Sequence, residues 1–283
     1  MRYGACMQNV LKQLAYYDVL DRPFLMSDLG TSLRSDLVSE RDGYYYLFDR
    51  EYLVPLRKER QRISRRKWQI ARRVAWWLRF VPFARVVFVS GSLSMENADE
   101  LSDLDVIVVA KHGHIWTVRL LVMGLLIVLG KARRHEDRVA PDKICPNHFV
   151  TDQSLHIPFH SMYTAHLYAN LVPLIAVDRD DLKKFREANT WVRDYASVWN
   201  MPENKIVPQG LSFALQWLCE IFIGTKLEAW SARYQRHRIE SKANVIRPGG
   251  HLVYNDNMLA FHLGSSEAEI LRKYEDNKSK LIT

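Results

Sequence analysis

The chain has 283 residues, of which 48 % are hydrophobic and 25 % charged, and its formal net charge is +8. This composition is that of a globular protein and excludes a disordered or low-complexity chain. The three cysteines lie far apart and show no metal-ligand spacing, which argues against a disulfide framework and a zinc site. The first residues lack the apolar core of a signal peptide, so we expect a cytoplasmic protein.

Two apolar runs, residues 120–129 and 210–230, can be compared with membrane spans. The first is only ten residues long, and the second contains Glu220, Lys226 and Glu228. A membrane span needs about 20 almost uninterrupted apolar residues. Both runs are therefore predicted to form buried helices, and no membrane partner is expected.

Residues 1–55 predict a small helical unit that ends in a β-hairpin. Residues 7–17 carry apolar side chains at helical spacing, and a second, short helix is expected over residues 28–33. Asp42-Gly43 is a hairpin turn signal, and an aromatic strand over residues 44–48 follows it. This order is typical of a winged helix, but little room is left for a recognition helix. We therefore expect a trimmed winged-helix-like segment.

Residues 52–80 are predicted to form one long helix, of which residues 56–80 connect the first segment to the next. Ten basic residues and one acid, Glu59, lie within 57–79, so the excess positive charge of the chain belongs to this helix. Such a run is either a solvated helix face or a track for a polyanion such as RNA or DNA. Trp68, Trp76 and Trp77 either stack on bases or belong to the packing face of the helix.

Residues 81–160 predict the core of an α+β fold with a small mixed sheet. Apolar strands are expected over 86–90, 104–109 and 144–150, with helices over 94–101 and 114–130. Residues 161–283 are predicted to be mainly helical, with Pro173, Pro202 and Pro208 as breaks, a strand-like piece at 251–254 and a last helix over 265–274.

Two aspartates occupy the start of the second predicted strand. Asp103 and Asp105 are two residues apart, so their side chains point the same way from a strand. Two carboxylates this close repel each other unless a cation lies between them. Mg²⁺ prefers one or two carboxylates together with phosphate oxygens and water. The pair is therefore predicted to bind metal.

A glycine and a serine end the preceding strand. Gly91 has no side chain to block a phosphate group, and Ser92 adds a hydroxyl beside the backbone N–H groups of the following helix. A phosphate site beside metal-binding carboxylates is what phosphoryl or nucleotidyl transfer requires.

This pattern resembles the signature of the DNA polymerase β-like nucleotidyltransferases. It consists of an apolar strand, Gly91-Ser92, ten residues, and then Asp103-x-Asp105 followed by apolar residues. The superfamily includes CCA-adding enzymes, aminoglycoside nucleotidyltransferases, poly(A) polymerases and small antitoxin-type transferases. The resemblance is specific over about residues 86–109. The wider chain is also similar to uncharacterised bacterial proteins that carry a winged-helix-like segment before this domain.

The resemblance implies a phosphate grip at Gly91 and Ser92 and metal ligands at Asp103 and Asp105, with two Mg²⁺ ions as cofactors. It implies transfer of a nucleoside monophosphate from an NTP, most simply ATP, to a hydroxyl group, with pyrophosphate leaving. A catalytically inactive nucleotide-binding or nucleic-acid-associated regulatory protein on the same fold is the alternative.

Active members of that superfamily usually bring a third acid from a later strand, which helps to accept a proton. The strand here carries Asn147 at that point, and an amide cannot act as a base. Strand alternation places Asn147, Phe149 and Thr151 on one face and Asp152 on the other. Three interpretations therefore stay open. A loop acid such as Asp142 takes the place of the third carboxylate, two carboxylates are enough for catalysis, or the domain binds a nucleotide without turnover.

Other polar residues give weaker signals. Lys143 precedes the same strand and is a candidate contact for the triphosphate, and a solvated loop lysine is an equally good interpretation. The histidines at 156, 160 and 166 do not share one helix face, so a chance cluster is favoured over a metal site.

Overall fold

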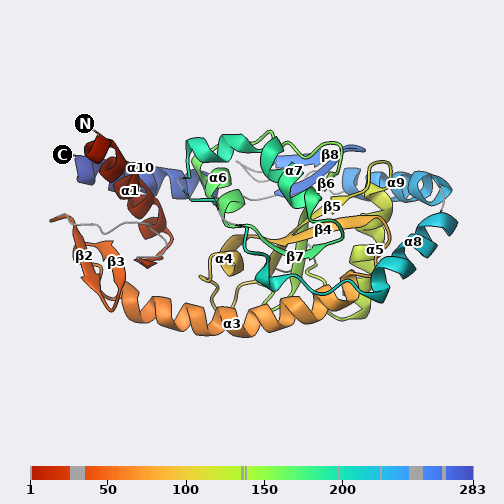
Figure 1. Ribbon diagram of the computed structural model, residues 1–283, viewed down its shortest axis with the longest axis horizontal. Coiled ribbons are helices and arrows are strands. Elements are labelled where there is room, and N and C mark those ends of the chain that lie inside the picture. Colours follow the sequence, from red (N-terminus) through yellow and green to blue (C-terminus); the bar gives the residue numbers. More distant parts are fainter. Residues whose placement is uncertain are drawn as a thin grey trace.

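The computed structural model describes residues 2–25, 36–134, 137, 139–196, 198–199, 201–223, 225–241, 251–262 and 266–282. It contains a three-stranded and a six-stranded sheet, and helices cover the larger one (Figure 1). The α+β class and the mixed sheet are confirmed.

The six-stranded sheet has a parallel pair at its centre. Strands β5 and β6 are parallel, and all other neighbouring strands are antiparallel. The order is β7 (Val172–Ala176), β4 (Ala84–Val89), β5 (Leu104–Ala110), β6 (Ile144–Thr151), β9 (Met258–His262) and β8 (His251–Tyr254).

Half of this sheet comes from the part of the chain that was expected to be mainly helical. Strand β8 was predicted, whereas β7 and β9 were not. Pro173 suggested a break, but it lies in β7 at the edge of the sheet, next to a register shift opposite Phe88. Proline is tolerated at an edge because its missing N–H breaks no ladder there. The sheet therefore extends beyond the predicted core of residues 81–160.

Helices pack on both faces of the sheet. Helices α3 (Leu53–Leu78) and α5 (Ile115–Val128) cover the face that carries Val87 and Val89. Helices α6 (Met162–Ala169), α7 (Asp180–Ala188) and the short η1 (Thr190–Asp194) cover the face that carries Val86 and Phe88. Because side chains alternate along a strand, the apolar run of β4 is buried on both sides.

The N-terminal unit contains the predicted hairpin. Strands β2 (Val38–Arg41) and β3 (Tyr44–Leu47) are joined by Asp42 and Gly43, both with positive φ, and β1 (Phe24–Leu25) pairs with β3. The expected helix over 28–33 lies outside the described residues. Helix α1 (Arg2–Val19) packs against α10 (Glu267–Ile282), which runs further than predicted and brings both ends of the chain together (Figure 1).

Two predicted helices differ from the structure. Helix α4 (Gly91–Ser94) begins at the glycine and ends at Ser94, whose hydroxyl donates back to the Gly91 carbonyl instead of capping a helix to residue 101. The run 210–230 forms α8 (Leu211–Phe222) and the start of α9 (Thr225–Glu240), after the short η2 (Glu203–Lys205). The large apolar side chains of α8 are exposed instead of buried. No described helix combines the length and apolarity that crossing a membrane requires.

A buried histidine joins α6 to the N-terminal unit. The His166 ring stacks on Tyr16 with 4.3 Å between ring centres, and its Nδ1 lies 3.1 Å from the Tyr17 hydroxyl. Burial, followed by the charge of Arg22, lowers the pKa of His166 to about 3. His166 is therefore a core residue that packs against Tyr16 and Tyr17.

We predict that His166 makes the folded state sensitive to mild acid. The unfolded chain binds a proton near pH 6.5 but the folded chain does not, so stability is complete above pH 6.5 and falls as the pH drops toward 3. At pH 5 the loss should be about 2 kcal/mol. In urea titrations, His166→Phe should reduce the difference between pH 7 and pH 5. The control His237→Gln, at an exposed position, should keep the parent difference in stability between pH 7 and pH 5. The same pH dependence of stability in both variants would contradict the assignment.

Candidate metal and phosphate site

The Gly91 bend and Asp105 lie against each other. Strand β4 ends at Val89, and the Ser90 amide donates to the Asp105 carbonyl at 3.0 Å. Gly91 then adopts φ +69°, and a Cβ there would lie 2.8 Å from Asp105 Oδ2. Only glycine fits both this backbone angle and this approach. The two sequence features that suggested a phosphate grip and a metal ligand therefore meet across adjacent strands.

A thiol joins the two aspartates. Ligand atoms of Asp103, Asp105 and Cys145 lie within 4.8 Å of one another, and all three residues are partly exposed. Cys145 is the register partner of Asp105 in the parallel pair β5–β6. This group can hold a metal ion. Cys145 was not predicted, although it is the second residue of its strand, as Asp105 is of β5.

The carboxylates repel each other in this setting. Burial raises the pKa of Asp105 to about 7, the Asp103 charge contributes to the rise, and Arg133 and the Cys145 hydrogen bond oppose it. Burial and the same two carboxylates also raise the pKa of the Cys145 thiol, which therefore stays protonated. A bound cation would offset the repulsion between the carboxylates.

The Asn147 side chain points toward the aspartates, as predicted, but a β-bulge and not the regular alternation of side chains along the strand puts it there. Its Nδ2 donates to Asp105 Oδ1 at 2.8 Å. The register shifts between Pro146 and His148, so Asn147 is an extra residue that bulges from the ladder. The expectation that Asn147 and Phe149 share a face is wrong, because the bulge reverses the alternation and Phe149 enters the opposite core.

The acids proposed as substitutes point elsewhere. Asp142 accepts a hydrogen bond from Lys67 Nζ at 2.7 Å, and Asp152 accepts one from the His112 amide at 2.8 Å, at the far end of β6. Within the described residues, the site therefore has two carboxylates, one amide and one thiol. Glu136, another acid near this strand, lies outside the described part of the chain.

The basic side chain that contacts the aspartates is Arg133, whereas the sequence suggested Lys143 as the basic residue of this site. The Arg133 guanidinium pairs with Asp103 Oδ2. Lys143 instead donates to the Gly130 carbonyl at 2.7 Å, at the end of α5. On the other side of the site, Tyr163 of α6 lies near enough for Asp105 to contribute, after burial, to raising the tyrosine pKa to about 12.

Helix α3 holds the loop that joins the two halves of the site. The side chains of Arg57 and Lys67 are buried and donate to backbone carbonyls of this loop, residues 95–102. The contacts are Arg57 with the Met95 and Glu96 carbonyls, Arg60 with Asn97, Arg66 with the Glu100 carboxylate, and Lys67 with the Glu100 and Ser102 carbonyls. Part of the basic run thus has a structural role that its sequence did not reveal.

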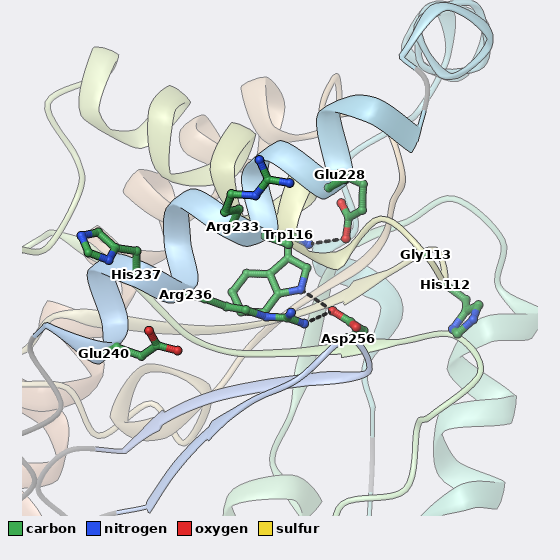
Figure 2. Close-up of a pocket in the computed structure, with 11 residues that line it drawn as sticks. His112, Gly113, Trp116, Glu228, Arg233, Arg236, His237, Glu240 and Asp256 are labelled. Carbon is green, nitrogen blue, oxygen red and sulfur yellow. Dashed lines mark hydrogen bonds and ion pairs between the residues drawn. The ribbon is translucent and has the colours of Figure 1, made fainter.

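A pocket lies away from the aspartates. It has a volume of about 730 Å³ and opens between α9 and the end of β5 that is opposite Asp105. The polar groups in this pocket form hydrogen bonds with one another (Figure 2). The Asp256 carboxylate accepts hydrogen bonds from the Trp116 indole at 2.7 Å and from Arg236 at 2.5 Å, and the Glu228 carboxylate accepts one from the Trp116 backbone amide. These contacts tie α9 and the β8–β9 turn to the start of α5.

We predict that Gly91→Ala destabilises the protein more than a glycine substitution at a similar backbone angle. Gly113 has φ +77° and nothing within 4 Å of an added Cβ, so Gly113→Ala measures the cost of the angle alone, about 1 kcal/mol. Gly91→Ala adds the collision with Asp105 and should cost about 1–3 kcal/mol more. Urea denaturation of both variants measures the difference, and equal losses would show that Asp105 moves aside freely.

Comparisons with protein-family models, curated proteins and solved structures find no match to this chain. The contacts among Gly91, Asp103, Asp105 and their neighbours are therefore the basis for a functional proposal.

Proposed function

We propose that this chain is a magnesium-dependent nucleotidyltransferase that moves a nucleoside monophosphate from an NTP, most simply ATP, to a hydroxyl acceptor. The proposal rests on the close contact between Gly91 and Asp105. A Cβ at position 91 would lie only 2.8 Å from Asp105 Oδ2. This contact brings the Gly91 bend, with the backbone N–H groups that begin α4, directly beside two carboxylates. Phosphate donors next to metal-binding carboxylates are the combination that nucleotidyl transfer needs.

The donor atoms fit Mg²⁺ through the carboxylates. Asp103 and Asp105 offer the hard oxygen ligands that this ion prefers, and phosphate oxygens and water would complete its shell. The Cys145 sulfur is a soft donor and therefore a poor ligand for a hard cation. We therefore assign the metal to Asp103 and Asp105, with Cys145 as a neighbour.

The residues around the aspartates bind and orient. Gly91 and the first amide groups of α4, which have no partner inside the helix, provide room and donors for a phosphate. Arg133 lies beside Asp103, where its guanidinium can also pair with a phosphate oxygen. Asn147 and Cys145 orient Asp105 by hydrogen bonds. When bound, the metal ions polarise the transferred phosphoryl group and neutralise charge on the leaving pyrophosphate.

Removing the charge of the two aspartates should abolish transfer. Asp103→Asn and Asp105→Asn keep the shape of the side chains but weaken metal binding, so we expect at least about a 1000-fold loss of rate. The measurement is the transfer of label from α-labelled NTPs to acceptors in a cell lysate, with Mg²⁺ present. Asp152→Asn, at the far end of β6, is the matched control. Transfer at the parent rate in the double variant would refute the assignment.

A non-catalytic nucleotide-binding protein is the second candidate. Asn147 stands where the resemblance leads us to expect a proton acceptor, and its amide cannot take a proton. Calorimetry with the four NTPs and Mg²⁺, followed by an assay for pyrophosphate, separates the two candidates. Nucleotide binding without pyrophosphate release favours this one.

We further propose that α3 binds single-stranded nucleic acid. Most basic side chains of this helix have partners within the protein, but Arg65, Arg72 and Arg73 are exposed and form no ion pair within the described chain. Arg72 and Arg73 lie three or four residues before Trp76 or Trp77, and Arg65 lies two turns before Arg72, so these residues share one broad side of α3. Trp76 and Trp77 are 47 % and 52 % exposed. The Arg79 guanidinium lies over the Trp76 ring, 3.3 Å from its centre, so Trp77 is the aromatic side chain offered to a base here. Free cations beside an exposed aromatic ring fit a phosphate backbone and its bases.

Removing the three free cations should change the salt dependence of RNA binding. If each contacts a phosphate, Arg65→Gln, Arg72→Gln and Arg73→Gln together should lower the slope of log K against log salt by about 2. The control removes three exposed cations elsewhere, at Lys183, Arg186 and Arg193. Fluorescence anisotropy with a generic single-stranded RNA measures both slopes, and equal slopes would exclude α3 as the binding surface.

A further inference from the structure

Helix α8 is amphipathic, but its polar residues face the protein interior and its apolar residues face outward. Ser212, Gln216 and Glu220 recur every four residues and therefore share one face. Ser212 and Gln216 are buried, and Gln216 donates to the Val81 carbonyl at 2.8 Å. Glu220 accepts from the Phe83 amide at 2.8 Å and binds both terminal nitrogens of Arg85 at 2.8 and 2.9 Å.

These contacts fix the rotation of α8. Turning the helix to bury its apolar residues would break the two-pronged pair of Glu220 with Arg85, both of which are mostly buried. It would also leave the Gln216 amide without the carbonyl that it binds. The inward polar face is thus held by directional bonds, and the apolar face is left outward.

The outward face is large and carries no charge. Seven of its side chains are between 44 % and 80 % exposed, namely Leu211, Phe213, Leu215, Trp217, Leu218, Ile221 and Phe222. Glu220 is the only charged residue of α8, and it points inward. No other helix or strand in the described part of the chain packs broadly on α8, which stands at the end of the molecule far from α1 and α10 (Figure 1).

The exposed area matches one half of a stable interface. Large apolar side chains at these exposures present on the order of 800 Å² in total. The largest apolar patch of an ordinary monomer measures about 300–600 Å². One partner in a standard interface buries about 800 Å².

We propose that α8 is a homodimer interface, in which α8 of one protomer packs against α8 of a second copy. Leu211, Leu215, Leu218 and Phe222 follow at intervals of four, three and four residues, the spacing of a helix–helix seam. An uncharged face can meet its own copy without bringing like charges together. A lipid surface fits less well, because lipid-binding helices carry lysine and arginine on their polar face and α8 has neither.

The test is the solution mass of the full chain. Sedimentation velocity over a range of concentrations should give a dimer for the parent chain. Leu218→Glu and, separately, Phe222→Glu should weaken dimerisation about 100-fold or more, because each places a charge in the seam of both copies. Phe48→Glu, an exposed apolar residue of the N-terminal unit, is the matched control and should leave the dimer intact.

Three results would overturn the proposal. They are a parent chain that stays monomeric at every concentration, a dimer that survives both α8 substitutions, and a monomer that co-sediments with anionic lipid vesicles through this face. Circular dichroism melts of each variant verify folding. Since both substituted side chains are exposed in the monomer, the variants should melt as the monomeric fold does.

Discussion

The buried ammonium of Lys67 fixes the geometry on which the site depends. It is fully buried, and it is satisfied by the Glu100 and Ser102 carbonyls and by the Asp142 carboxylate. A charge in this position is tolerated only when such partners surround it. Ser102 precedes Asp103, and Asp142 precedes β6, so one side chain of α3 sets where β5 and β6 begin and how Asp105 and Cys145 come alongside each other.

The same contacts change the meaning of the basic run. A sequence with ten cations in 23 positions suggests a surface for polyanions, yet Arg57, Arg60, Arg66 and Lys67 bind the loop between Gly91 and Asp103. The positive charge of α3 therefore serves first to order that loop. Of the basic side chains of α3, Arg65, Arg72 and Arg73 are exposed and form no ion pair within the described residues.

The sequence was sufficient for features that depend on local pattern. The α+β class, the long helix, the hairpin, the strand before Gly91 and the strand of Asp105 follow from periodicity and turn residues, as does the proximity of Asp103 to Asp105. Features that depend on distant partners were not predictable. Arg133 and Cys145 reach the aspartates through tertiary packing, the Asn147 bulge reverses a simple alternation, and α8 looks like a core helix until the partners of Glu220 are known.

The place of β9 has a consequence for how the chain acquires its structure. This strand pairs with β6, although more than a hundred residues separate them, and among the described strands β8 has β9 as its one neighbour. During synthesis, β6 therefore exposes an open edge until residue 262 has left the ribosome, and contacts of such high sequence separation form slowly. The nascent chain is thus most prone to aggregation after the aspartates have been made and before the sheet is complete.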